Sequence, residues 1–435
     1  MLYNKNQYMP VSSGISVNNN LEIGGCDLAG LAAEYGTPLY IMDEETLRAN
    51  CRDYMLSFSS NYSDVMIAYA SKALSVLGVL KIIGEEGLGV DVVSGGELYL
   101  ALKAGIVPQK IIFHGNNKSP QELIEALQAG VGLIVVDNLQ ELKNLEEIAG
   151  RLQKKASILI RVTPGIEAHT HDFIKTGGFD SKFGIHIERV CDFIEEIKHC
   201  NNIDFAGLHA HIGSQILEVN PFGFAVEKMT ELIEKIQKRN HLEIKILNLG
   251  GGLGISYLER ETPPPVAEYA RVIGQELKYN LERRKLPFPK LIIEPGRSIV
   301  GRAGVTLYTI GAVKENKNIR KYLFVDGGMS DNPRPMMYGA KYAADIVSKI
   351  SSRKNEMVTV AGKFCESGDV LIKDIHLPAA LSGDLLAVYA TGAYNYAMAS
   401  NYNQNPRPAM VLVGQGKSRL LVRRETYDDL TAKQE

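Results

Sequence analysis

The chain has 435 residues, of which 45% are hydrophobic, so it can form two or three domains with a large core. Its 48 Lys and Arg balance 50 Asp and Glu without charge runs, which argues against a nucleic-acid-binding or basic membrane-facing surface. No apolar run is long enough to cross a bilayer, and five scattered cysteines lack any metal-type spacing. We therefore expect a soluble protein of a reducing, cytoplasmic compartment.

From about residue 64 to residue 301, short apolar strands alternate with amphipathic helices. The predicted strands are Val65–Tyr69, Gly89–Val93, Lys110–Phe113, Leu133–Val136, Ser157–Val162, Phe205–Ala210, Lys245–Leu249 and Leu291–Ile293. Helical spacing of apolar residues predicts helices over Gln121–Gln128, Leu139–Leu152 and Phe224–Arg239. An open doubly wound sheet has the same alternation. The strand count and the placement of polar residues favour an α/β fold of the (β/α)8 TIM barrel type, which spans about 250 residues.

After Arg302, strands are separated by turns rich in Gly, Pro, Asn and Asp. The predicted strands are Ala303–Lys314, Tyr322–Asp326, Val358–Ala361, Asp384–Tyr389 and Ala409–Val413, with one helix over Tyr338–Ser348. This pattern predicts a C-terminal β-sandwich or β-barrel domain. The N-terminal segment is too short to fold alone, and we expect it to complete this β domain. The predicted limits are 1–40 for the N-terminal segment, 41–301 for the barrel and 302–435 for the β domain.

Polar residues follow almost every predicted barrel strand, where barrel enzymes place their chemistry. Lys72 follows the first strand, and a partly desolvated lysine has a lowered pKa and can hold an aldehyde as a Schiff base. The next strands carry Asp91, Ser94-Gly-Gly-Glu97, His114-Gly-Asn116 and Arg161. Most lysines at strand ends are simply solvated, so a catalytic role of Lys72 needs support from the residues at the other strand ends.

The triplet Gly250-Gly-Gly252 follows the seventh predicted strand and lets the backbone approach an oxyanion closely. Gly296 and Arg297 follow the eighth strand, and these two loops form the usual phosphate site of a barrel. Ser214 can add a hydroxyl group. A dinucleotide fingerprint is excluded because its third glycine would fall on Ile255 or Tyr257. If the glycine triplet is considered by itself, it can also be a tight turn that binds no ligand.

His209 and His211 alternate along one predicted strand, so both face the same side. They suit a metal pair, or a core histidine and one site histidine. Without a neighbouring carboxylate or cysteine to complete a zinc set we predict no metal, here or at His169 and His171, and expect His211 to stack on a flat cofactor. Glu294 ends the eighth strand, where an anion needs a cationic partner such as a heterocycle nitrogen. Lysine, phosphate cradle and carboxylate together describe pyridoxal 5'-phosphate.

With these residues in place, the chain resembles the barrel-type pyridoxal-phosphate decarboxylases of basic amino acids, and within them the branch that acts on diaminopimelate. The resemblance extends from Gly36 to Asn401. The motifs that carry it are Tyr69-Ala-Ser-Lys72, Asp91-Val-Val-Ser-Gly-Gly-Glu97, Ser181-Lys-Phe-Gly-Ile185, His211-Ile-Gly-Ser-Gln215, Gly250-Gly-Gly252, Glu294-Pro-Gly-Arg-Ser298, Cys365-Glu-Ser-Gly-Asp369 and Gly392-Ala-Tyr394.

The resemblance implies a role for each motif. Lys72 would bind the cofactor covalently, Glu294 would pair with the pyridinium and His211 would stack on the ring. Cofactor and phosphate contacts would come from Asp91, Ser214, Gly251, Gly252, Gly296, Arg297 and Tyr394. Cys365 would be the catalytic acid, supplied by the partner subunit of a homodimer with shared active sites. A buried small hydrophobe is the ordinary fate of a free cysteine, but the Cys-Glu-Ser-Gly-Asp context favours the catalytic role.

The implied substrate is meso-2,6-diaminopimelate, which is decarboxylated to L-lysine in the last step of lysine biosynthesis. Its second amino-acid head needs cations and an anion together, whereas ornithine or lysine presents only an ammonium. The family assigns the distal carboxylate to Arg297, Arg334 and Tyr338, with Tyr394 alongside, and the ammonium to Glu366. One departure, Gly178-Phe179, leaves room for a related substrate whose far end is also a zwitterion or an amide. A decarboxylase of another amino acid, or of one attached to a carrier protein, is the alternative enzyme. A non-catalytic relative that binds a partner protein is an alternative; the intact Lys72, Cys365 and Glu294 argue against it, and a failure to bind the cofactor would favour it.

Overall fold

The computed structural model describes residues 6–165 and 181–435. Two compact units make up the chain. Unit 1 comprises Met1–Ala49, Ile255–Thr262 and Arg297–Glu435, and unit 2 comprises Asn50–Gly254 and Pro263–Gly296. Helix α2 (Glu44–Asn61) carries the chain from the first unit into the second.

Unit 2 is a closed parallel barrel in the part of the chain that the structure describes. Its ring of eight strands is β5 (Val65–Ala70), β6 (Gly89–Val92), β7 (Ile111–Phe113), β8 (Leu133–Val136), β9 (Ala156–Thr163), β11 (Ile203–Ala210), β12 (Ile246–Asn248) and β13 (Lys290–Ile293). The ring closes because β8 pairs with β9 and β13 pairs with β5, with Ile134 opposite Ile158 and Leu291 opposite Val65. All eight strands coincide with the predicted ones to within a few residues. The closure excludes the doubly wound sheet.

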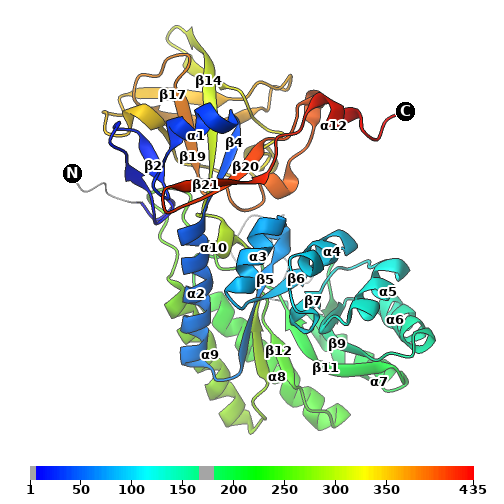
Figure 1. Cartoon of the computed structure of the whole chain (residues 1–435). Helices are drawn as coiled ribbons and strands as arrows, with labels where there is room; N and C mark the ends of the chain where they lie inside the picture. Colours follow the sequence, from blue (N-terminus) through cyan, green and yellow to red (C-terminus); the bar gives the residue numbers. More distant parts are fainter. Residues whose placement is uncertain (1–5, 166–180) are drawn as a thin grey trace. The chain divides into compact units, whose positions relative to one another are not determined.

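Helices surround these strands. They are α3 (Leu77–Glu85), α4 (Gly95–Lys103), α5 (Pro120–Ala129), α6 (Leu139–Arg151), α7 (Val190–Ile197), α8 (Asn220–Asn240) and α9 (Val266–Arg284). Figure 1 shows α5 and α6 on one side of the strands and α8 and α9 on the other. Small and branched side chains fill the barrel, among them Ala68, Ile112, Val135, Leu159 and Ile292. The short strand β10 (Ile185–His186) pairs with the end of β9 outside the ring.

Unit 1 is a mixed β structure. Its strands are β14 (Gly304–Asn316), β15 (Arg320–Val325), β16 (Ala344–Ile346), β17 (Glu356–Ala361), β18 (Val370–Leu377), β19 (Leu385–Tyr389), β20 (Ala409–Gly414) and β21 (Lys417–Val422). Short helices α10 (Arg297–Val300), α11 (Arg334–Tyr338) and α12 (Tyr427–Thr431) lie in its connections. Its core includes Leu307, Tyr308, Val360 and Tyr389, all almost fully buried.

The N-terminal segment completes this β unit, as the sequence predicted. Strand β4 (Leu39–Asp43) pairs antiparallel with β14 and parallel with β20. In Figure 1 the blue β4 lies next to the orange β20, although they are far apart in the sequence. A small sheet of β1 (Gly14–Ile15), β2 (Leu21–Ile23) and β3 (Cys26–Asp27) precedes helix α1 (Leu28–Tyr35).

The predicted helix over Tyr338–Ser348 is wrong. Helix α11 ends at Tyr338 because Gly339 adopts a left-handed conformation with φ 60°, which ends a helix. The following residues form β16, in which Ala344 pairs with Val388 of β19. Pairing with a distant strand therefore decides the conformation of these residues.

The predicted fold class is confirmed. A parallel eight-stranded barrel is joined to a mixed β unit that includes the N-terminal strand β4. The exact residue limits proposed for three segments stay a prediction. Among the described helices, none combines the length and the apolar character that a membrane crossing requires.

Candidate functional site

Lys72 lies directly after β5, in the one-turn helix Ser71–Ala73, and its side chain is exposed. The turn is tied to the start of helix α4, because Ser71 donates a hydrogen bond to the Glu97 carboxylate at 2.8 Å. Glu97 also accepts the backbone N–H of Val93 at 2.8 Å, and Ser94 caps α4 by accepting the N–H of Glu97 at 3.2 Å. The Ser94–Glu97 motif therefore orders the backbone beside Lys72.

Glu294, which follows β13, is buried at the centre of a polar cluster inside the barrel. Its Oε1 lies 2.8 Å from His114 Nε2 and accepts the Asn248 amide at 2.6 Å. Its Oε2 lies 3.2 Å from His209 Nε2. Asp91 completes the cluster, with Oδ1 3.8 Å from His114 Nε2. Five strands, β6, β7, β11, β12 and β13, thus bring these residues together.

The electrostatics of this cluster keep Glu294 ionised. Burial alone would raise the pKa of Glu294, but His114, His209 and the hydrogen bonds they donate hold it well below its usual value. Burial lowers the pKa of His209 to about 3, so its ring is neutral at physiological pH. Burial and the neighbouring Glu294 raise the pKa of Asp91 to about 6, against the lowering influence of His114. Glu294 therefore stays negatively charged over the pH range in which Asp91 gains or loses its proton.

The glycine triplet after β12 packs where no side chain fits. A Cβ at Gly251 would lie 2.1 Å from the carbonyl oxygen of Glu294, and one at Gly252 would lie 2.6 Å from that of Gly213. Gly252 also has φ 124°, a left-handed conformation that favours glycine. The triplet backbone is thereby pressed against the ends of β11 and β13. A Cβ at Gly296 would meet Ala70 at 3.1 Å, which brings the eighth loop against β5.

His211 and Ser214 follow β11. His211 Nδ1 accepts the N–H of Gly251 at 3.3 Å, which fixes the ring against the triplet. Part of the ring is open to solvent, yet the surrounding protein and the nearby cations of Lys72 and Arg161 lower its pKa well below the usual value. A neutral aromatic ring results. Ser214 is partly buried in the same loop.

Unit 1 contains a buried pair of arginines around a tyrosine. The Tyr257 hydroxyl accepts hydrogen bonds from Arg297 at 2.6 Å and from Arg334 at 3.0 Å. Arg334 also donates to Tyr342 at 2.6 Å. Burial alone would raise the pKa of Tyr257, but the two guanidinium groups lower it below its usual value. The region carries concentrated positive charge and suits an anionic ligand.

The other predicted residues of unit 1 are less enclosed. The ring of Tyr394 lies 4.8 Å from the Arg297 guanidinium, and its backbone has φ 62°, which is rare for a non-glycine residue. Cys365 and Glu366 are exposed, and the N–H of Cys365 donates to Asn403 at 3.0 Å. Tyr338 is half-buried at the end of α11. No hydrogen bond among the described residues links Cys365 or Glu366 to the arginine pair.

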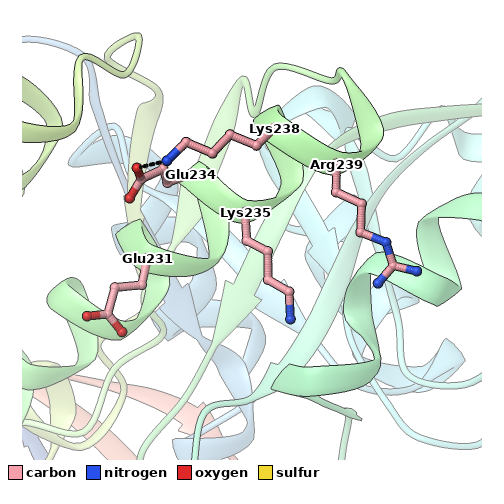
Figure 2. Close-up of a pocket in the computed structure, with 5 residues that line it drawn as sticks. All are labelled: Glu231, Glu234, Lys235, Lys238 and Arg239. Carbon is pink, nitrogen blue, oxygen red and sulfur yellow. Dashed lines mark hydrogen bonds and ion pairs between the residues drawn. The ribbon is translucent and has the colours of Figure 1, made fainter.

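Two other groups of charged or polar residues lie close together in the described structure. The ligand atoms of His114, His209 and Glu294 lie within 4.8 Å of one another, a spacing that could hold a metal ion. The depression on α8 shown in Figure 2 is lined by Glu231, Glu234, Lys235, Lys238 and Arg239, and Glu234 pairs there with Lys238. These charged side chains belong to the outer face of a helix, so we assign no chemistry to them. Gly178-Phe179, His169 and His171 lie outside the described residues.

Comparison with known proteins decides the family. Residues 46–301 match the family described as pyridoxal-dependent decarboxylase, pyridoxal binding domain. A diaminopimelate decarboxylase of Bacillus subtilis is 47% identical over 415 residues, which cover 95% of this chain and 94% of that protein. The chain belongs to the diaminopimelate decarboxylase family.

Solved structures agree. The diaminopimelate decarboxylase from M. jannaschii in co-complex with L-lysine superposes with a TM-score of 0.90 at 34% identity, over 98% of both chains. The Helicobacter pylori enzyme complexed with L-lysine has a TM-score of 0.87 at 33% identity, over 93% of this chain and 98% of that one. The predicted family, enzyme class and cofactor are confirmed.

The residues present fit pyridoxal phosphate. Glu294 is a buried carboxylate whose pKa is held low, and it retains an acceptor position on Oε2 for a protonated ring nitrogen. The Gly250–Gly252 backbone has no room for side chains, as expected where a phosphate approaches closely. Lys72 is the lysine that follows β5. It lies near Asp91, and its positive charge partly offsets the rise in the pKa of Asp91 that burial causes.

The sequence alone predicts no role for His114 or Asn248, and it allows either a core or a metal-binding interpretation of His209. A polar asparagine at the end of an apolar strand, directly before the glycine triplet, was the available signal. Tyr257, which bridges the arginines, has no sequence signal because its partners come from distant segments.

Proposed function

We propose that this protein decarboxylates meso-2,6-diaminopimelate to L-lysine and carbon dioxide, the last step of lysine biosynthesis. The observation that carries the choice of substrate is the buried arginine pair. Arg334 is only 7% exposed, and no carboxylate pairs with it among the described residues. A guanidinium in this position stabilises a carboxylate on the ligand, which ornithine and lysine lack at their far ends.

Residues of unit 2 would hold the cofactor. Lys72 would bind its aldehyde, Glu294 its ring nitrogen and His211 one face of its ring. Ser214, Gly251, Gly252 and Gly296 offer hydroxyl and backbone N–H donors for a phosphate. Asp91, which lies 3.8 Å from His114, is proposed as a further cofactor-binding residue. When bound, pyridoxal phosphate supplies an electron sink for the bond that breaks as carbon dioxide leaves. In unit 1, Arg297 and Tyr394 are proposed for the phosphate and for the substrate.

Two further roles concern the substrate. Arg334, with Arg297, Tyr338 and Tyr394, would bind the distal carboxylate, and Glu366 the distal ammonium. Cys365 would donate its thiol proton to the carbon that has lost carbon dioxide. The exposure of Cys365 and Glu366 in the single chain supports the proposal that a partner subunit completes the site in a homodimer. None of the five cysteines forms a disulfide in the described structure, which supports a reducing, cytoplasmic compartment.

The test is carbon dioxide release by the purified protein with pyridoxal phosphate. The protein is offered meso-diaminopimelate, LL-diaminopimelate, lysine, ornithine and arginine separately. We expect release from the meso compound alone, with lysine as the second product. Release from lysine or ornithine would overturn the role of Arg334. If none of these compounds releases carbon dioxide, the proposed substrate is wrong, and a related or carrier-bound amino acid becomes the candidate.

A further inference from the structure

The carboxylate of Glu294 is held by donors from three different strand ends. Asn248 ends β12, His209 lies on β11 and His114 follows β7, across the ring from the other two. A carboxylate has about four acceptor positions. Two on Oε1 are taken by His114 and Asn248, and one on Oε2 is taken by His209. One position on Oε2 stays available among the described contacts.

The orientation of two of the donors, Asn248 and His209, follows from their other contacts. The Asn248 side-chain oxygen accepts the N–H of Gly250 at 2.8 Å, so its NH2 group must face Glu294. His209 is buried, and its Nδ1 has no hydrogen-bond partner among the described residues. Its single ring proton therefore lies on Nε2, where Glu294 accepts it. The His114 ring packs edge-on against that of His209 at 4.7 Å, which limits rotation of both.

The chemistry of these donors matters for what Glu294 can bind. An amide and a neutral imidazole satisfy the carboxylate oxygens but do not cancel the negative charge. An arginine or lysine in their place would neutralise Glu294 and remove its attraction for a cation. The cluster is therefore suited to a ligand that brings one positive charge and one N–H, as a protonated pyridine does.

We propose that His114, His209 and Asn248 are positioning residues that hold Glu294 with one oxygen directed at the ring nitrogen of the cofactor, so that this nitrogen stays protonated. The inference rests on the proposed cofactor role of Glu294. It predicts that loss of a donor weakens the interaction with the ring nitrogen specifically, whereas contacts with the phosphate and the aldehyde are unchanged.

The experiment compares two ligands on cofactor-free protein. One is pyridoxal 5'-phosphate, and the other is its 1-deaza analogue, which has a C–H in place of the ring nitrogen. Dissociation constants are measured for the wild type and for His209→Leu, Asn248→Leu and His209→Gln. We expect the two leucine variants to bind pyridoxal phosphate about tenfold to a hundredfold more weakly and the analogue as the wild type does. Glutamine places an N–H near the former Nε2 and should restore most of the affinity.

A second readout is the nitrogen resonance of ring-labelled pyridoxal phosphate. We expect a protonated ring in the wild type and in His209→Gln, and a shift toward the unprotonated form in His209→Leu. The matched control is Asn240→Leu, because Asn240 is a buried asparagine of the same unit that donates to the Glu195 carboxylate at 2.5 Å. It should change neither ligand's affinity.

The possible results separate the inference from the function on which it rests. Equal weakening of both ligands in the leucine variants would mean a general structural role and would overturn the inference, as would no weakening of either. Because analogue binding reports an intact fold, a variant that binds only the analogue supports it. A wild type that binds neither ligand would instead overturn the cofactor assignment itself.

Discussion

The Tyr257 hydroxyl lies 3.0 Å from the Arg334 guanidinium, and both side chains are buried. The tyrosine holds the arginine in place without neutralising it, because a phenol is a weaker partner than a carboxylate. The positive charge of Arg334 is therefore available to an anionic ligand. Burying this charge costs free energy, which the binding of the ligand offsets.

The first prediction concerns Arg334. Arg334→Lys should raise the KM for meso-diaminopimelate about tenfold to a hundredfold, because lysine cannot offer two parallel N–H groups to a carboxylate. Absorbance of the bound cofactor should be unchanged. The control Arg320→Lys alters a partly exposed arginine of the same unit that contacts Thr359 at 2.6 Å, and its KM should equal that of the wild type. An unchanged KM in Arg334→Lys would contradict the assignment.

Lys72→Ala should remove the absorbance of the lysine-bound cofactor and lower turnover by at least about a thousandfold, because no other residue replaces the covalent bond. A spectrum of the protein mixed with pyridoxal phosphate measures this directly. The control is Lys110→Ala, which alters an exposed lysine that donates to the Gly87 carbonyl at 2.9 Å. Retention of the wild-type spectrum in Lys72→Ala would refute the role of Lys72.

Cys365→Ala should leave the cofactor bound and lower turnover about a hundredfold or more, since a general acid contributes that much. Cys200→Ala, which alters a partly exposed cysteine of unit 2, is the control. If the partner subunit supplies Cys365, mixing Lys72→Ala with Cys365→Ala chains should restore about a quarter of the wild-type activity by random reassociation. Absence of any recovery in reassociated dimers would argue against shared sites.

Stability should depend on pH through Asp331. Burial raises the pKa of Asp331 to about 7, although Tyr308 and the N–H of Gly328 donate hydrogen bonds to it. A folded-state pKa above the unfolded value of about 3.9 means that the folded protein binds the proton more tightly. The associated stability is present below about pH 4 and is lost as pH rises through 7.

Asp331→Asn should therefore gain stability relative to the wild type between pH 4 and pH 8, by up to about 4 kcal/mol. Denaturant unfolding at several pH values measures the difference. Asp204→Asn, at an exposed position, should show no such trend. A difference that is constant with pH would show that Asp331 is ionised in the folded protein throughout this range.

Metal removal should have no effect. Although His114, His209 and Glu294 have the spacing of a metal site, their ligand atoms already serve one another as hydrogen-bond donors and acceptors. Dialysis against EDTA should leave turnover unchanged, and elemental analysis should find no stoichiometric zinc. Activity that EDTA abolishes and zinc restores would reassign this cluster as a metal centre.

The sequence alone determined the features that depend on neighbouring residues. Alternating apolar runs and helical spacing located all eight barrel strands, and Lys72, the Gly250–Gly252 triplet and Glu294 stood out because each is unusual at the end of an apolar strand. These signals are local, since a buried strand must be apolar and a close backbone approach requires glycine. The same local reasoning failed at Tyr338–Ser348, where a distant strand decided the conformation.

Only the tertiary structure decided which polar residues meet. His114 and Glu294 are 180 positions apart, yet closure of the barrel brings them within 2.8 Å. Tyr257 and Arg334 are 77 positions apart and meet in unit 1. Such contacts depend on strand order, register and ring closure, which a single sequence does not encode locally. Burial inside that closed structure also lowers the pKa of His209, whereas Glu294 keeps its charge because the contacts with His114 and His209 outweigh its burial.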